Sequence, residues 1–188
     1  EKFPQAKGVA DKVVDVAGAA QDRAHELGDG GDGDDHQHLA PLGRGLAEAV
    51  AQHYPNDVVI GGDSMLLLDG QLQGKPHTEA ATIERWHAQA GRQAELLTGH
   101  CLLYDGKVYT EVAATRVVFA QATADDIAAY AATGEPWKCA GAFTLEALGG
   151  WFIDRIDGDP SSVIGLSLPV VRRALYHFGF GVSDFWNR

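Results

Sequence analysis

Apolar residues recur along this chain at the two spacings that distinguish helices from strands. Positions three and four residues apart form a single apolar stripe, as an amphipathic helix requires, in five segments. These segments are residues 6–27, 42–53, 78–90, 124–133 and 167–178. Pro55 follows the second segment, and Gly134 and Gly179 follow the last two, so each of these helices has a residue that ends it.

Short apolar runs between the helical segments predict strands. Val58–Ile60 reads as a buried strand, and residues 149–156 read as another. Asp69-Gly70 and Asp105-Gly106 each lie between apolar runs and predict two hairpins. Because hairpin strands are antiparallel, the sheet is not all parallel. We therefore predict an α/β fold with a mixed sheet in one domain over residues 1–188, without internal repeats.

Residues 28–38, with the sequence GDGGDGDDHQH, lie between the first two helical segments. Their aspartate spacing resembles a calcium-binding loop, but Gly31 and Ala40 stand where an EF-hand needs a ligand and a bidentate glutamate. We interpret this segment as a flexible acidic insertion.

Composition narrows the class of protein. The chain has 188 residues, 45% hydrophobic and 22% charged, as in soluble globular proteins. Its net charge of −11 disfavours binding to nucleic-acid polymers, and no apolar run reaches the roughly 18 residues of a membrane span. Cys101 and Cys139 form neither a disulfide framework nor a zinc site, so we expect a cytoplasmic protein.

The stretch VVIGGDSMLLLDGQLQGKP, residues 58–76, brings a carboxylate and a lysine to the ends of one predicted hairpin. Asp63 follows the predicted strand, where ligands of α/β sheets gather, and could hold Mg²⁺ or take a proton from a water. A structural aspartate is the alternative. Lys75 is not part of a P-loop, because three residues separate Gly70 from Gly74 and Pro76 follows. It could contact a phosphate or be solvated.

The stretch GEPWKCAGAFTLEALGG, residues 134–150, leaves two interpretations open. Small residues before Phe143 suggest either a backbone that approaches a flat ligand or tight packing of a helix on a strand. In the later stretch GDPSSVIGLSLP, Ser161 and Ser162 could bond a ligand, and Ser167 is expected to cap the last helix. The chain lacks G-x-S-x-G, H-E-x-x-H and C-x-x-C motifs, which disfavours esterase, zincin and redox chemistry.

These stretches, together with AGR…LLTGH, occur in the order found in Maf (septum-formation) proteins, and the chain resembles that family from about Lys7 to the last helix. The resemblance implies a fold similar to inosine-triphosphate pyrophosphatases: an elongated mixed sheet flanked by helices, in two lobes with the site in the cleft. It also implies a nucleoside triphosphate pyrophosphatase that uses a divalent metal, Mg²⁺ or Mn²⁺, to release pyrophosphate from a nucleoside triphosphate, standard or modified.

The resemblance assigns roles to five residues. Asp63 matches the family's catalytic aspartate, a proton acceptor and a metal ligand. Lys75 and Lys7 match lysines expected at the phosphates. Ser64 falls where the family usually has threonine beside the substrate, and Glu146 falls where many members have a glutamine linked to base selection.

The chain also departs from the family pattern. It opens with EKFPQAKGVADKVV, so the family's N-terminal Ser-x-Ser-Pro-Arg-Arg loop is expected upstream of a fragment that is weakly active or inactive by itself. Ionised Glu146 cannot donate hydrogen bonds as glutamine does, which leaves the preferred base open. Lys138-Cys139 replaces the common Asp-Lys pair, so that lysine's role does not transfer simply.

Three activities remain open at this stage. The first is metal-assisted hydrolysis at the α-phosphorus; the second is nucleotide binding without turnover in a regulator of cell division. The third is a phosphatase that releases orthophosphate, although its Asp-x-Asp pair at a first strand end is not evident. The phosphate product distinguishes them, and the sequence leaves monomer and homodimer equally open.

Overall fold

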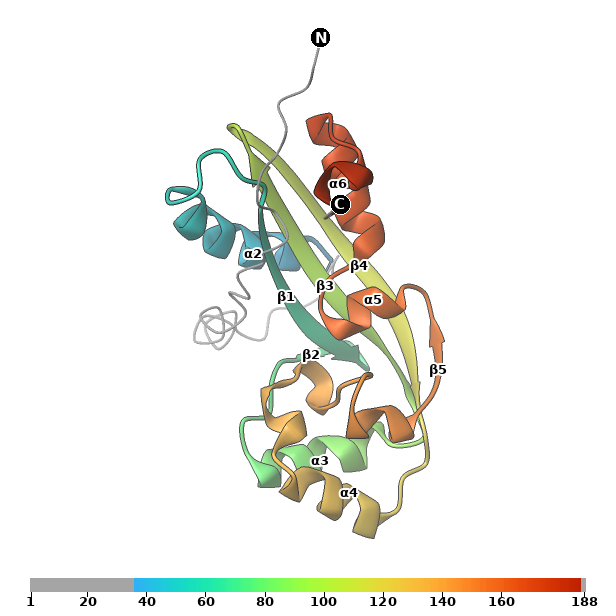
Figure 1. Cartoon of the computed structure of the whole chain (residues 1–188). Coiled ribbons are helices and arrows are strands. Elements are labelled where there is room, and N and C mark those ends of the chain that lie inside the picture. The colour runs from blue at the N-terminus through green and yellow to red at the C-terminus, as the bar shows by residue number, and fades with distance from the viewer. Residues whose placement is uncertain (1–35, 187–188) are drawn as a thin grey trace. The chain divides into compact units, whose positions relative to one another are not determined.

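The structure is a computed structural model that describes residues 36–186, and the described chain forms two compact units (Figure 1). Of the described residues, unit 1 comprises 36–63, Gly99–Ala113 and 166–186, and unit 2 comprises Ser64–Thr98 and Ala114–Gly165. None of the described helices combines the length and apolar composition that crossing a bilayer requires.

Five strands form one sheet in the order β2-β1-β3-β4-β5. Their bounds are β1 Val59–Leu68, β2 Gln71–Gln73, β3 Gln93–Tyr104, β4 Lys107–Phe119 and β5 Ile153–Asp157. The pairs β1–β2 and β4–β5 are antiparallel. Both predicted hairpins are confirmed, since Asp69 and Gly70 have φ of 51° and 77°, and Asp105 and Gly106 have φ of 46° and 71°. Positive φ at both central residues is the geometry that Asp-Gly turns favour.

In unit 1, helices α2 (His36–Ala51) and α6 (Leu168–Phe178) flank the strands on opposite sides (Figure 1). Ala47 of α2 packs with Val59 and Cys101, while the neighbours of these two residues pack against α6: Val58, which directly precedes β1, and Leu102 of β3. Side chains of consecutive strand residues point to opposite faces, so β1 and β3 place one of each pair under each helix. Ser167 caps α6, as predicted, by accepting a hydrogen bond from the Val170 N–H at 3.3 Å.

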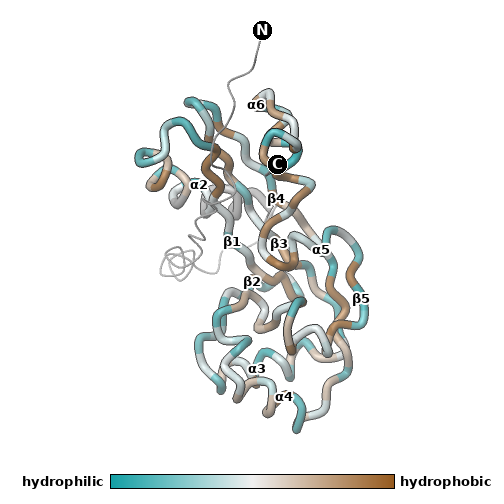
Figure 2. Tube along the Cα trace, in the orientation of Figure 1, coloured by the Kyte–Doolittle hydropathy of each residue, from teal (hydrophilic) through white to brown (hydrophobic). Residues whose placement is uncertain are grey.

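In unit 2, helices α3 (Glu79–Gln89), α4 (Ala124–Ala132) and α5 (Pro160–Ile164) accompany short 3₁₀ turns at Glu135–Lys138, Ala140–Ala142 and Leu148–Phe152. Trp86 is fully buried at the centre of the apolar core, and its Nε1–H donates to the Ala142 carbonyl at 2.8 Å. Thr78 and Thr123 cap α3 and α4 by accepting the N–H groups of Ala81 and Asp126. In Figure 2 apolar residues concentrate along the strands, whereas hydrophilic residues gather in the connecting loops.

Three predicted boundaries were wrong. The predicted strand 149–156 is a 3₁₀ turn up to Phe152, and β5 begins only at Ile153. Helix α2 begins at His36 instead of Leu42, so residues 36–38 of the expected insertion are helical. Strand β1 continues from Val59 through Leu68, so Asp63 lies in mid-strand and not at a strand end. The glycines at 61 and 62 read as a strand end, but Gly61 serves close packing under α2. The predicted helix 6–27 and residues 28–35 of the insertion lie outside the described residues.

Candidate functional site

Asp63 is buried, with 9% of its surface exposed, in the part of β1 that belongs to unit 1. It lies on the same side of the strand as Val59 and Gly61, the side covered by α2. A Cβ built on Gly61 would lie 2.3 Å from the Gly43 carbonyl oxygen, and one built on Gly43 would lie 2.8 Å from the Gly61 oxygen. The small size of Gly61 and Gly43 therefore serves close contact between helix and strand.

Ser64, the first residue of unit 2, is half-buried and joins a chain of hydroxyl groups. Its Oγ lies 2.8 Å from the Thr98 Oγ1, and the Thr98 hydroxyl donates to the Ser162 carbonyl at 3.2 Å. Because Thr98 has one hydroxyl proton, the proton between Ser64 and Thr98 comes from Ser64 when Thr98 donates to Ser162. Thr98 and Ser162 are fully buried, so the hydrogen bonds that link Ser64 to them hold Ser64 in place.

Lys75 lies between β2 and α3, in a segment tied at both sides to the 3₁₀ region of unit 2. The Gly74 carbonyl accepts from the Gly141 N–H at 3.3 Å, and the His77 N–H donates to the Trp137 carbonyl at 2.9 Å. The Arg85 guanidinium also donates to the Gly74 carbonyl, and its partial burial lowers the pKa of Arg85. These contacts hold half-buried Lys75 beside residues 137–141.

Glu146 lies in an exposed loop of the same unit. The charges of Glu146 and Lys75 both act on the Cys139 thiol. Burial raises the pKa of the Cys139 thiol, the carboxylates of Glu146 and Glu135 raise it further, and the Lys75 ammonium lowers it. Each of these charged groups therefore lies within Coulombic range of the Cys139 thiol.

Two other sequence expectations have clear outcomes in unit 2. Phe143 is buried with 4% exposure and packs edge-on against Phe119 at a centroid distance of 5.3 Å. A Cβ on Gly141 would lie 2.9 Å from Leu66, so the small residues before Phe143 serve tight packing and not a stacked base. Lys138 is exposed at the end of its 3₁₀ turn.

Comparison with known proteins agrees with these motifs. A sequence profile described as "Maf-like protein" matches residues 9–178. The chain belongs to the Maf-like protein family. It is 72% identical over 148 residues to a protein of Corynebacterium aurimucosum, covering 79% of this chain and 75% of the relative. It is 66% identical over 149 residues to one of Corynebacterium diphtheriae, with the same coverage, and 54% identical over 158 residues to one of Nocardia farcinica, covering 79% and 74%. All three relatives are named "Nucleoside triphosphate pyrophosphatase".

The remaining Maf-type expectations concern Lys7 and the metal. Lys7 lies outside the described residues. Within residues 36–186, no three side chains of histidine, cysteine, aspartate or glutamate gather as a preformed metal site. Mg²⁺ commonly binds through one or two carboxylates, water and substrate phosphates, so a single carboxylate such as Asp63 fits such an ion.

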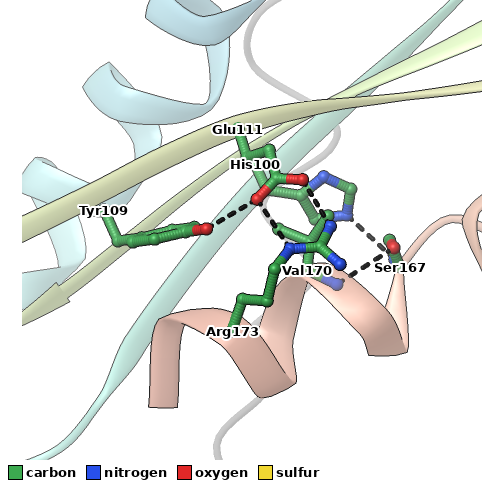
Figure 3. Close-up of polar contacts among 6 residues, drawn as sticks. All are labelled: His100, Tyr109, Glu111, Ser167, Val170 and Arg173. Atoms are coloured by element: carbon green, nitrogen blue, oxygen red, sulfur yellow. Dashed lines mark hydrogen bonds and ion pairs between the residues drawn. The ribbon is translucent and has the colours of Figure 1, made fainter. Parts of the chain in front are cut away.

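Sequence reasoning missed two polar networks of this Maf-type chain. In unit 1, the Nε2 of buried His100 accepts a hydrogen bond from the Ser167 N–H at 2.9 Å (Figure 3). In the same unit, the Glu111 carboxylate accepts hydrogen bonds from Arg173 of α6 and from the Tyr109 hydroxyl. The Arg173 guanidinium holds the pKa of Glu111 below its usual range. In unit 2, Glu135 accepts several backbone and side-chain hydrogen bonds. The Thr-Gly-Glu-Pro sequence contains no periodicity that would have indicated this role.

Proposed function

We propose that this protein hydrolyses nucleoside triphosphates to the nucleoside monophosphate and pyrophosphate. The observation that carries the proposal is the family match over residues 9–178, with relatives of 54–72% identity that are named for this activity. The substrate class extends in this proposal to modified as well as standard nucleoside triphosphates.

Asp63 is the proposed catalytic carboxylate. In the reaction a water oxygen forms a bond to the α-phosphorus, and the bond from that phosphorus to the oxygen bridging to the β-phosphate breaks. The electron pair of the broken bond leaves with pyrophosphate, and the proton of the water passes to Asp63. A carboxylate that is 9% exposed is shielded from bulk water, and this strengthens its interaction with a positive or polar reactant.

A divalent metal is proposed to accompany the substrate. Asp63 would hold it, and when bound it would offset negative charge on the phosphates and polarise the reacting oxygen. Among the described residues no group of three or more histidine, cysteine, aspartate or glutamate side chains would bind such an ion by itself. This fits an ion whose remaining ligands are phosphate oxygens and water.

Lys75 is proposed to bind the leaving pyrophosphate. Its ammonium is a compact point charge, and the backbone bonds at Gly74 and His77 hold its segment in place. Such fixed positive charge stabilises the negative charge that develops on the leaving group. Lys7 is proposed to share this role.

Ser64 and Glu146 are proposed to contact the nucleoside. Ionised Glu146 only accepts hydrogen bonds, so it favours a base edge that presents N–H donors. The Ser64 hydroxyl oxygen lies 2.8 Å from the Thr98 hydroxyl oxygen, which holds it in place. The acceptor character of Glu146 favours bases with exocyclic amino groups over bases that present carbonyl groups alone.

The decisive experiment incubates the complete chain and its Asp63→Asn variant with ATP, GTP, CTP, UTP and modified triphosphates, with Mg²⁺ or Mn²⁺. Release of pyrophosphate together with an equal amount of monophosphate supports the proposal, and the variant is expected to lose most of this activity. Nucleotide binding without any product would favour the non-catalytic regulator, and orthophosphate alone would favour a phosphatase. Full activity of Asp63→Asn would refute the role of Asp63.

A further inference from the structure

The carboxylate of Glu135 collects four hydrogen bonds from one side of unit 2. Its Oε1 accepts from the Gly149 N–H at 3.0 Å, from the Thr144 hydroxyl at 3.2 Å and from the Tyr130 hydroxyl at 3.1 Å. Its Oε2 accepts from the Leu148 N–H at 3.2 Å. Three of these donors lie immediately before and after residues 145–147, so one carboxylate fixes both ends of the loop that carries Glu146.

The loop between these anchors is folded tightly on itself. A Cβ on Gly149 would lie 2.5 Å from the Thr144 carbonyl oxygen and 2.5 Å from the Tyr130 hydroxyl oxygen. A Cβ on Gly150 would lie 2.5 Å from the Leu145 carbonyl oxygen. Only glycine fits at either place, so the backbone on both sides of Glu146 is closely packed while the Glu146 side chain is exposed.

Glu135 is in the ionised state that accepting these four hydrogen bonds requires. Burial alone would raise the pKa of this carboxyl group, but the bonds from the amides of Gly149 and Leu148 and from the hydroxyls of Tyr130 and Thr144 lower it. The group is therefore ionised at neutral pH and accepts at both oxygens. Burial and the charge of Glu135 raise the pKa of Tyr130, so its hydroxyl keeps the proton that it donates.

We propose that Glu135 is a positioning residue that sets base selection by holding the loop of Glu146. The inference rests on the proposed function, in which Glu146 contacts the base. Glu146 has no rigid element of its own, because it lies between two 3₁₀ turns, at Ala140–Ala142 and Leu148–Phe152. Its direction therefore depends on the bonds at Thr144, Leu148 and Gly149. Discrimination between bases requires a polar group held in a fixed position.

The test compares Glu135→Gln, Glu146→Gln and the double variant, with Asp154→Asn as a control. Asp154 is an exposed carboxylate on β5 of the same unit, and its replacement removes the same charge. The glutamine amide in Glu135→Gln keeps one acceptor oxygen, but its NH₂ group replaces the second oxygen and faces N–H or O–H donors with which it cannot bond. Thr144→Val removes a single donor and is a milder variant for the case in which Glu135→Gln does not fold.

Two quantities are measured. The first is the hydrogen-exchange rate of the Leu148 and Gly149 amides, which is expected to rise at least tenfold in Glu135→Gln and to stay unaltered in Asp154→Asn. The second is the ratio of kcat/KM between the best and the worst of ATP, GTP, CTP and UTP. This ratio is expected to change about tenfold or more in Glu135→Gln, equivalent to about 1.4 kcal/mol of discrimination. Thr144→Val is expected to change both quantities in the same direction by a smaller factor.

The double variant separates positioning from stability. If Glu135 acts through Glu146, the double variant has the same base ratio as Glu146→Gln alone, within about twofold. A purely structural role of Glu135 would lower kcat/KM for all four nucleotides by one common factor and leave their ratio unaltered. That result would overturn the inference. Faster exchange without a changed ratio overturns it too.

Failure of the proposed function is recognised separately. If the complete wild-type chain releases no pyrophosphate, that function is wrong, and the ratio of dissociation constants for the same four nucleotides replaces the ratio of kcat/KM. An altered ratio in Glu135→Gln then still supports positioning, and equal affinities of the wild-type protein for all four bases overturn it.

Discussion

Replacement of Gly61 by alanine introduces a methyl group into the contact between β1 and α2 of unit 1. The added Cβ would lie 2.3 Å from the Gly43 oxygen, 3.0 Å from the Ala47 nitrogen and 3.1 Å from the Ala47 Cβ. Since non-bonded heavy atoms prefer separations of about 3.5 Å or more, strand and helix must move apart by roughly 1 Å. The contacting atoms belong mostly to the helix backbone, so no flexible side chain can relieve the clash.

The expected loss of stability follows from this geometry. Overpacking of a closely packed core costs about 1–3 kcal/mol, and a clash with backbone belongs at the upper end of that range. For a chain of this size each kcal/mol lowers the melting temperature by about 2–4 °C, so Gly61→Ala is expected to melt roughly 5–10 °C lower. Thermal and urea unfolding followed by circular dichroism measure the change.

Gly45→Ala is the matched control for this substitution. Gly45 lies in α2, two residues from Gly43, and a Cβ there meets nothing within 4 Å. Alanine in a helix is more favourable than glycine by about 0.5–1 kcal/mol, so this variant is expected to be slightly more stable than the wild type. A Gly61→Ala protein as stable as the wild type would refute the packing explanation of the two glycines.

Three further predictions concern other parts of the chain. Trp86→Phe loses the hydrogen bond to the Ala142 carbonyl and part of the edge-on ring contacts with Phe119, Tyr130 and Phe152. This variant is expected to have a free energy of unfolding about 2–4 kcal/mol lower than the wild type. An unchanged midpoint of urea unfolding would contradict this expectation. Burial raises the pKa of Cys101 to about 11, so iodoacetamide at neutral pH is expected to label Cys101 only after unfolding, and rapid labelling of the native protein would argue against its burial. Because the pKa of Glu135 is lowered in the folded state, its contribution to stability is fully present above the pKa of the unfolded chain and is lost as the pH falls through the folded value. Amide chemical shifts of Leu148 and Gly149 are expected to titrate together in that acidic range, and shifts that do not move would show that the carboxylate does not bind these amides.

The sequence predicted best the features that local chemistry determines. Asp-Gly turns need positive φ at two consecutive residues, and Ser167 caps its helix through a bond to a backbone N–H three residues away. These interactions are visible in a window of a few residues. The α/β class followed from the same turns and helix ends.

The errors came from contacts between distant parts of the chain. Gly61 appeared to end a strand, because the residue that requires its small size, Gly43, lies in another element. The close approach of Lys75 to the segment 137–141 depends on backbone bonds from Gly74 and His77. The partners of Glu135 lie up to 14 residues away in irregular structure, where no spacing rule applies. Asp63 and Lys75 were singled out from the predicted hairpin, whereas Ser64 and Glu146 were named from the family resemblance. The roles of all four stay predictions.

The central claim is that Asp63 serves hydrolysis at the α-phosphorus of a nucleoside triphosphate. Its most direct measurement is phosphorus NMR of the products formed in ¹⁸O-labelled water by the wild type and by Asp63→Asn. We predict label in the monophosphate, none in the pyrophosphate, and a turnover number at least about 100-fold lower in the variant. Orthophosphate as the first product, or undiminished turnover by Asp63→Asn, would contradict the claim.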